Sequence, residues 1–164
     1  MGHFDYMRAT NFEGQSLNIQ GNGIVQVAKT SASFVADGDA ITSGAMSLPA
    51  NAVILDCYAV VKTGLAYATA TLGVRFGTAA SGAQIVALDP DGLATSATSL
   101  AAGKGMSTDS ERNTSLGAAA ATVVVADAAY SANARSIFGE VKASTGAFTA
   151  GEVFFAVEYM VLED

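Results

Sequence analysis

The residue types that most often perform catalysis are scarce in this chain. His3 is the only histidine and stands beside the start of the chain, so a Ser–His–Asp or Cys–His arrangement would have to recruit a terminal residue. Cys57 is the only cysteine, so it can form neither an internal disulfide nor a thiolate zinc site. Because Cys57 lies in an apolar run, we expect a buried, inert thiol. The sequence predicts no catalytic residues and no enzyme.

Two glycine-rich stretches could be taken for nucleotide-binding loops, but neither has the required spacing. Around Gly103-Lys104-Gly105, Thr98 stands where a P-loop needs its first glycine, and Gly105 replaces the hydroxyl residue that holds magnesium. Gly21-Asn22-Gly23 lacks the third glycine of a dinucleotide fingerprint, because Gln26 occupies that place. We therefore expect no cofactor.

Close pairs of carboxylates could offer oxygen ligands to calcium: Asp37 with Asp39, Asp89 with Asp91, and Asp109 with Glu111. Turn geometry explains them better, since Asp-Gly and Asp-Pro-Asp-Gly are turn sequences and no pair continues into a twelve-residue calcium loop. We predict no metal site.

The elements that would position any site are strands, because the strongest periodic signal is alternation of period two between Gly-, Ser-, Thr- and Asn-rich turns. In the segment 53–63, Val53, Leu55 and Cys57 are expected to face inward. The segments 69–77, 136–143 and 152–162 alternate in the same way, and weaker strands are expected at 23–29, 40–48, 84–88 and 122–127. About eight short strands predict an all-β protein, an antiparallel β-sandwich of Greek-key or jelly-roll type.

Asp56 interrupts one of these apolar strands. A carboxylate in that position must face solvent, a partner or a hydrogen-bond donor. We expect it on the outer face of the sheet.

Two segments do not fit the alternation. Residues 1–20 lack it yet include the large apolar side chains Phe4, Tyr6, Met7 and Phe12. We predict that residues 1–20 form an extended N-terminal arm that contacts a partner protein or a sister subunit, and that 21–164 form a single sandwich domain. Residues 89–117 are small and polar and are expected to form a long surface loop.

Composition limits the partners. The 164 residues are 51% hydrophobic and 14% charged, with a net charge of −7, which disfavours direct binding to nucleic acid or to an anionic membrane. No apolar run reaches the length of a membrane span, and the first ten residues do not read as a signal peptide, so we expect synthesis in the cytoplasm.

Two segments resemble a known family. Met46–Val86 (MSLPANAVILDCYAVVKTGLAYATATLGVRFGTAASGAQIV) has a Leu-Pro turn, a Val-Ile-Leu-Asp strand and a Thr/Ala-rich strand ending in Gly, and Phe148–Asp164 (FTAGEVFFAVEYMVLED) has an alternating closing strand. Both resemble small virion proteins of tailed bacteriophages. The resemblance implies a capsid decoration (cement) protein: a β-sandwich that binds the outside of an assembled head and bridges neighbouring subunits of the major capsid protein, commonly as a homotrimer.

A second hypothesis is a glycan- or receptor-binding module of a phage fibre or tail. Such a module normally presents aromatic platforms in its loops, whereas the chain has no Trp and the segment 89–117 has no aromatic residue. These absences favour the decoration protein, located on the outer capsid surface of the virion.

Overall fold

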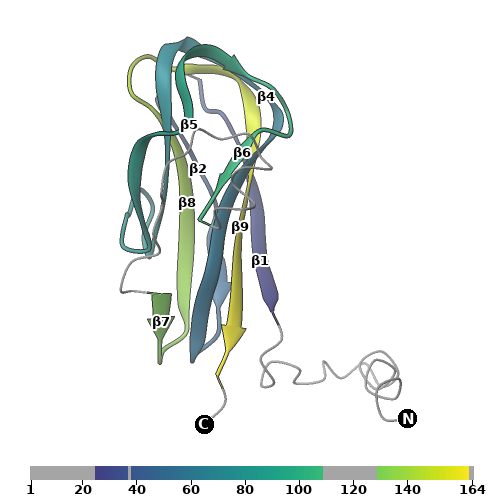
Figure 1. The fold of residues 1–164 in the computed structure, drawn as a ribbon, viewed down its shortest axis with the longest axis vertical. Helices are drawn as coiled ribbons and strands as arrows, with labels where there is room; N and C mark the ends of the chain where they lie inside the picture. The colour runs from purple at the N-terminus through teal and green to yellow at the C-terminus, as the bar shows by residue number, and fades with distance from the viewer. Residues whose placement is uncertain (1–24, 37, 109–128, 163–164) are drawn as a thin grey trace, which may run out of the picture.

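The computed structural model describes residues 25–36, 38–108 and 129–162, with the backbone alone for 87–96. It is all-β, which confirms the predicted class (Figure 1). The strands are β1 (Gln26–Ser33), β2 (Ala40–Thr42), β3 (Met46–Leu48), β4 (Ala52–Gly77), β5 (Val86–Leu100), β6 (Gly105–Ser107), β7 (Tyr130–Ser131), β8 (Arg135–Ala143) and β9 (Phe148–Val161).

All strand pairs are antiparallel, and the order β1-β9-β4-β8-β2 forms the path of one nine-stranded, nearly closed sheet. The 26-residue strand β4 runs along the length of the molecule (Figure 1). Residues 52–67 of β4 pair with β9, and its first half also pairs with β6 and β7. Residues 65–76 pair with β5, and residues 72–77 also pair with β8. Because one strand serves both sides, the sheet folds over on itself as a sandwich.

The core lies between these two sides, where aromatic rings from each meet. Phe76 of β4 and Phe155 of β9 pack edge to face, with ring centroids 6.2 Å apart, and both are fully buried. Gly139 of β8 makes room for them, because a Cβ there would lie 2.4 Å from a ring carbon of Phe155. A side chain at position 139 would therefore push the two aromatic rings apart.

The structure corrects one prediction about the loops. Residues 86–100 form β5 and residues 105–107 form β6, so much of the segment 89–117 is strand where a long surface loop was expected. Small and polar Ala, Ser and Thr residues are typical of loops, but here they form a strand because they pair with β4. The pairing of β5 with β4 contains several register shifts. The remaining residues of that segment, and the strand expected at 122–127, lie outside the described residues.

Candidate interaction surface

The described residues offer little for catalysis. The single histidine, His3, lies outside them, and no group of three or more His, Cys, Asp or Glu side chains among them could hold a metal ion. Of the acidic pairs named above, the described side chain is Asp39, which pairs with Lys142 at 3.3 Å. No helix in the described part of the chain is long and apolar enough to cross a membrane.

Cys57 is buried, as the sequence predicted. Burial raises the pKa of its thiol, the neighbouring Asp56 carboxylate raises that pKa further, and Arg135 acts in the opposite direction. The thiol therefore stays protonated and is a poor nucleophile at neutral pH.

Asp56 was expected on the outer face of the sheet, but its side chain is buried and faces hydrogen-bond donors. Its carboxylate is buried and accepts hydrogen bonds from the Ser107 hydroxyl at 2.8 Å and from the Thr108 backbone N–H at 3.0 Å. The Thr108 hydroxyl also donates to it. These bonds fasten β6 to β4, which indicates a structural role for the carboxylate.

A β-bulge beside Asp56 corrects the predicted faces of β4. Ile54 lies opposite Tyr159 and Asp56 lies opposite Glu158, so Leu55 is an extra residue without its own partner on β9. The extra residue shifts the alternation. Ile54 is therefore buried and Leu55 is exposed, the reverse of the inward face predicted for Val53 and Leu55.

The outward Leu55 belongs to an apolar surface at one end of the sheet. Among the described residues, six large apolar side chains are exposed, and five of them gather here from four neighbouring segments. We call this surface the terminal patch; its members, each between 42% and 51% exposed, are Val25, Val27, Leu55, Tyr130 and Leu162.

Strand register places these side chains on one face. Val53 of β4 lies between Tyr130 of β7 and Met160 of β9, so the three side chains stand side by side. Leu162 follows Met160 by two residues and shares its face, and its N–H donates to the Asn51 carbonyl at 3.0 Å. The Tyr130 hydroxyl donates to the Asn51 side chain at 3.2 Å, which holds the ring over the end of the sheet.

Val25 and Val27 continue this face onto β1, because Val27 lies opposite the outward Glu158. The terminal patch therefore occupies the end of the sheet at which β1 begins and β9 ends (Figure 1). Large apolar patches on a soluble protein mark surfaces that bind another macromolecule.

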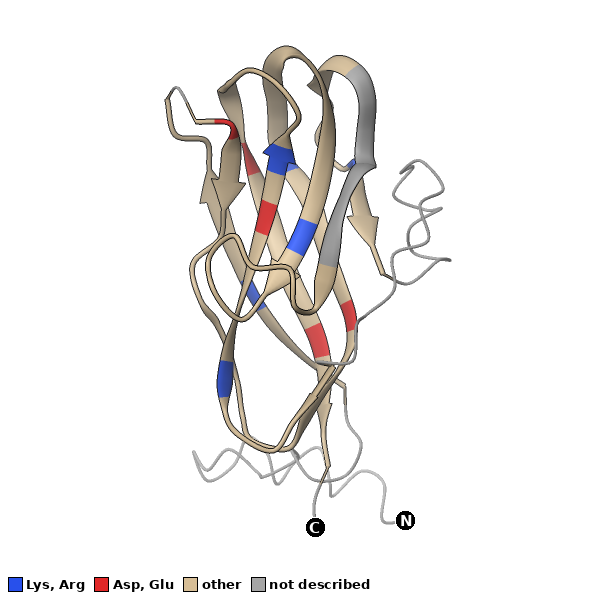
Figure 2. Cartoon of the chain, turned by 90° about the vertical axis from the view of Figure 1, so that its left-hand side faces the viewer, with Lys and Arg blue, Asp and Glu red and all other residues tan. Residues whose placement is uncertain are grey.

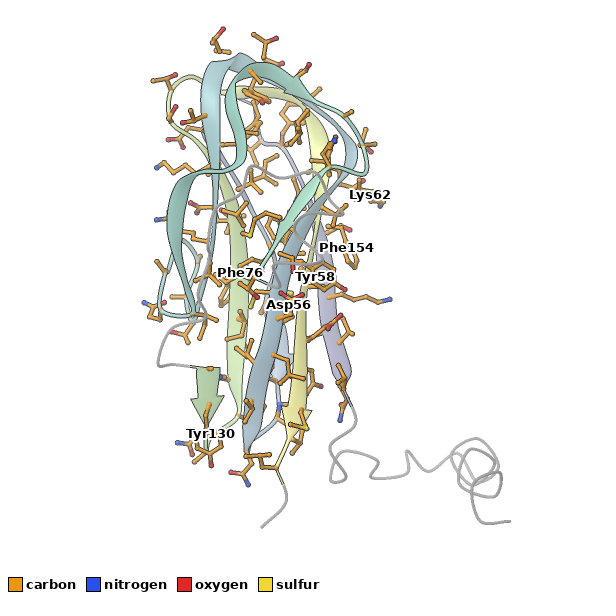
Figure 3. All side chains as sticks on the ribbon, in the orientation of Figure 1. Asp56, Tyr58, Lys62, Phe76, Tyr130 and Phe154 are labelled. Atoms are coloured by element: carbon orange, nitrogen blue, oxygen red, sulfur yellow. The ribbon has the colours of Figure 1, made fainter. Side chains whose placement is uncertain are left out.

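Farther along the same face, the side chains become aromatic and then charged. Tyr58 of β4 and Phe154 of β9 are half-buried, and their ring centroids lie 6.3 Å apart. Beyond them, the Lys62 ammonium donates to Glu152 at 2.8 Å (Figure 3). Elsewhere on the described ribbon, charged residues are few, as Figure 2 shows.

The predicted arm residues Phe4, Tyr6, Met7 and Phe12 lie outside the described residues. The described fold begins at Val25, a member of the terminal patch. Sequence reasoning missed the terminal patch itself. The valines at 25 and 27 were the available signal, but alternation alone does not say which face of an edge strand is buried.

Comparisons with known proteins give two structural neighbours. No protein-family model matches the chain, and no curated protein matches it. A chain of the cyanophage Pam1 capsid asymmetric unit shares 22% identity over 93% of this chain and 98% of that chain, with a TM-score of 0.46. A chain of the Ralstonia phage GP4 capsid shares 19% identity over 90% of each chain, with a TM-score of 0.45. Likeness of this degree assigns neither family nor function.

Proposed function

We propose that this chain is a structural virion protein that binds the outside of an assembled phage head as a decoration protein. The terminal patch is the observation that carries the proposal. Five exposed apolar side chains share one face at the end of the sheet, where no internal packing requires them. The resemblance of Met46–Val86 and Phe148–Asp164 to small virion proteins supplies the kind of partner. The two structural neighbours, both described as phage capsids, agree with the proposal without carrying it.

In this proposal, the terminal patch and the arm residues Phe4, Tyr6, Met7 and Phe12 contact the major capsid protein. A few large apolar or aromatic side chains placed in partner pockets provide most of the binding energy of a typical interface. Such a contact needs no catalytic group, metal or cofactor. The resemblance further suggests a homotrimer, which sedimentation equilibrium would reveal as three times the chain mass.

The contribution of the protein would be to stabilise the shell. A protein that binds the assembled lattice and not the free subunits stabilises the lattice by mass action, so its effect grows with occupancy. Heads that lack it should still assemble but should release their genome at a lower temperature.

The test compares purified heads that lack the protein with the same heads after the protein is added back. We expect added protein to co-sediment with the heads and to raise the temperature of genome release. Unchanged release temperature despite saturated binding would remove the stabilising role, and failure to co-sediment would remove the partner. Saturable binding to host-cell glycans without binding to heads would favour the fibre or tail module.

A further inference from the structure

Two members of the terminal patch are bonded to one residue that is not a member of it. Asn51 is half-buried and lies in the turn between β3 and β4. Its side-chain oxygen accepts the hydrogen bond from the Tyr130 hydroxyl at 3.2 Å, and its backbone carbonyl accepts the bond from the Leu162 N–H at 3.0 Å. The side chain and the main chain of Asn51 therefore each fix a different part of the patch.

Asn51 supplies these bonds where backbone pairing is weakest. β7 has only two residues, both paired with β4, and Leu162 follows the last residue of β9. The Arg135 guanidinium donates to the Ala129 carbonyl at 2.6 Å, which fixes the backbone next to Tyr130 but leaves its ring free to turn. The ring lies at the end of the sheet, half exposed, and its hydroxyl bond to Asn51 limits that rotation (Figure 3).

The backbone conformation of Asn51 explains why this residue type stands there. Its φ is 59°, in the left-handed region, which Gly, Asn and Asp tolerate better than other residues. Of these three, Gly has no side chain, whereas Asn and Asp both carry an oxygen that can accept a hydrogen bond. Position 51 therefore combines a left-handed turn with a side-chain acceptor.

We propose that Asn51 is the positioning residue of the terminal patch, which holds the Tyr130 ring and Leu162 in their binding positions before the partner arrives. An aromatic side chain that is already ordered loses less conformational entropy on binding, so fixing it raises affinity without adding a contact. The effect on affinity rests on the proposed function. The ordering of Tyr130 and Leu162 does not, and it can be measured on the free protein.

The first test measures the order of the Tyr130 ring in the free, full-length protein by NMR relaxation of the ring carbons. Asn51→Gly keeps the left-handed backbone and removes the acceptor, whereas Asn51→Asp keeps both. We expect the order parameter of the Tyr130 ring to fall by about 0.2 or more in Asn51→Gly and to be unchanged in Asn51→Asp. The Tyr58 ring, which packs against Phe154, is the internal control and should be the same in all three proteins.

The second test separates the main chain of Asn51 from its side chain by amide hydrogen exchange. Asn51→Ala removes the same acceptor as Asn51→Gly, but it also places a Cβ at a positive φ, where Ala is strained. Because the strained turn opens more often, we expect the Leu162 amide to exchange about fivefold faster in Asn51→Ala than in Asn51→Gly. The Val61 amide, which donates to the Lys104 carbonyl at 2.8 Å, should exchange equally in both and report an intact sheet.

The third test measures binding to heads that lack the protein. We expect Asn51→Gly to bind about threefold to tenfold more weakly than the natural chain, and Asn51→Asp to bind like it. Tyr130→Phe removes the donor but keeps the ring, so its loss should match that of Asn51→Gly. The double variant Asn51→Gly/Tyr130→Phe should lose no more than either single variant, because both remove the same hydrogen bond.

The outcomes distinguish this inference from the proposed function. If the natural chain does not bind heads, the proposed function fails, while ring order and amide exchange still decide whether Asn51 positions the patch. An unchanged Tyr130 ring in Asn51→Gly, or equal exchange of the Leu162 amide in Asn51→Ala and Asn51→Gly, would overturn the inference. Additive losses in the double variant would also contradict it, since Asn51 would then act on the partner and not through Tyr130.

Discussion

The two halves of β4 face the same core but present different outer surfaces. In the second half, Ala70, Leu72 and Val74 are buried and the outward positions are polar or charged: Thr69, Thr71 and Arg75, whose guanidinium pairs with Glu140. In the first half, Cys57, Ala59 and Val61 are equally buried, but the outward positions near the strand's start are Val53 and Leu55.

The difference between the two outer surfaces separates the apolar residues that the fold requires from those that it does not. Both halves need apolar residues inside, because both cover one core. The fold does not require Leu55 on the outside, and a bulge is needed to put it there. Apolar side chains that the fold does not use are therefore the best candidates for binding another protein.

The largest expected effect comes from deleting one residue in either half. Deleting Thr71 would reverse the inner and outer faces of the residues that follow it, so that Leu72, Val74 and Phe76 would leave the core, and we expect that protein not to fold. Deleting Leu55 would remove the bulge and leave Ile54 and Cys57 still facing inward, at a cost below about 2 kcal/mol in the free energy of unfolding. Circular dichroism and urea unfolding would measure both. If deleting Leu55 also prevents folding, the bulge is part of the fold and not an addition to it.

The second half contains a buried ion pair that should dominate its side-chain energetics. Glu140 of β8 is buried and is bonded by the Arg75 guanidinium and the Ser81 hydroxyl, and it also accepts from the Thr42 hydroxyl at 3.2 Å. Glu140→Ala leaves the largely buried guanidinium unpaired, so we expect a loss of about 3 kcal/mol in the free energy of unfolding.

The control for this ion pair is the double variant Arg75→Met/Glu140→Leu, which removes both charges and should lose less than Glu140→Ala alone. Urea unfolding of the three proteins gives the comparison. A double variant less stable than Glu140→Ala would show that the pair contributes more than it costs to bury.

Cys57, in the first half of β4, should make the free energy of unfolding depend on pH in alkaline solution. Burial raises the pKa of the folded thiol, so this group contributes stability below the ordinary thiol pKa of about 8.5, and that stability falls as the pH rises further. The free energy of unfolding should fall by up to about 1.4 kcal/mol per pH unit above that value. Cys57→Ala removes the titrating group, and its stability should depend less on pH over the same range. Parallel pH profiles for the two proteins would contradict the prediction.

The smallest expected effect is that of salt on capsid binding. Screening weakens exposed ion pairs, but it has little effect on apolar contacts such as those of the terminal patch. We expect the affinity for heads to change less than about threefold between 50 and 500 mM NaCl. Binding abolished within that range would show that charges, and not the terminal patch, provide the affinity.

Sequence patterns predicted the regular parts of the fold and missed the irregular ones. The alternation at 69–77 and in β9 placed Phe76 and Phe155 inside correctly, because each regular strand must bury one face. The bulge at Leu55 could not be predicted, since the extra residue depends on how β4 meets β9. β5 was taken for a loop because small polar residues form strands only when a neighbour supplies the pairing.

The sequence predicted that the candidate site would be an apolar contact surface, but it did not predict which described residues form it. The sequence indicated apolar contact residues next to the sandwich, but the four arm residues it named lie outside the described residues, so their role stays a prediction. The terminal patch combines residues that are as much as 137 positions apart in the chain, from Val25 to Leu162. Only the strand order brings them together.

The central claim, that the terminal patch binds the capsid, is tested most directly by co-sedimentation of two lysine variants with heads that lack the protein. Leu55→Lys places a charge in the patch, and Thr71→Lys places the same charge on the outer face of the second half of β4. Leu55 is exposed and Thr71 is half-buried on the outer face, so neither lysine enters the core and we expect both proteins to be about as stable as the natural chain. Leu55→Lys should bind at least about tenfold more weakly, because its charge must be desolvated in an apolar contact, while Thr71→Lys should bind like the natural chain. Equal binding by the two variants would contradict the account.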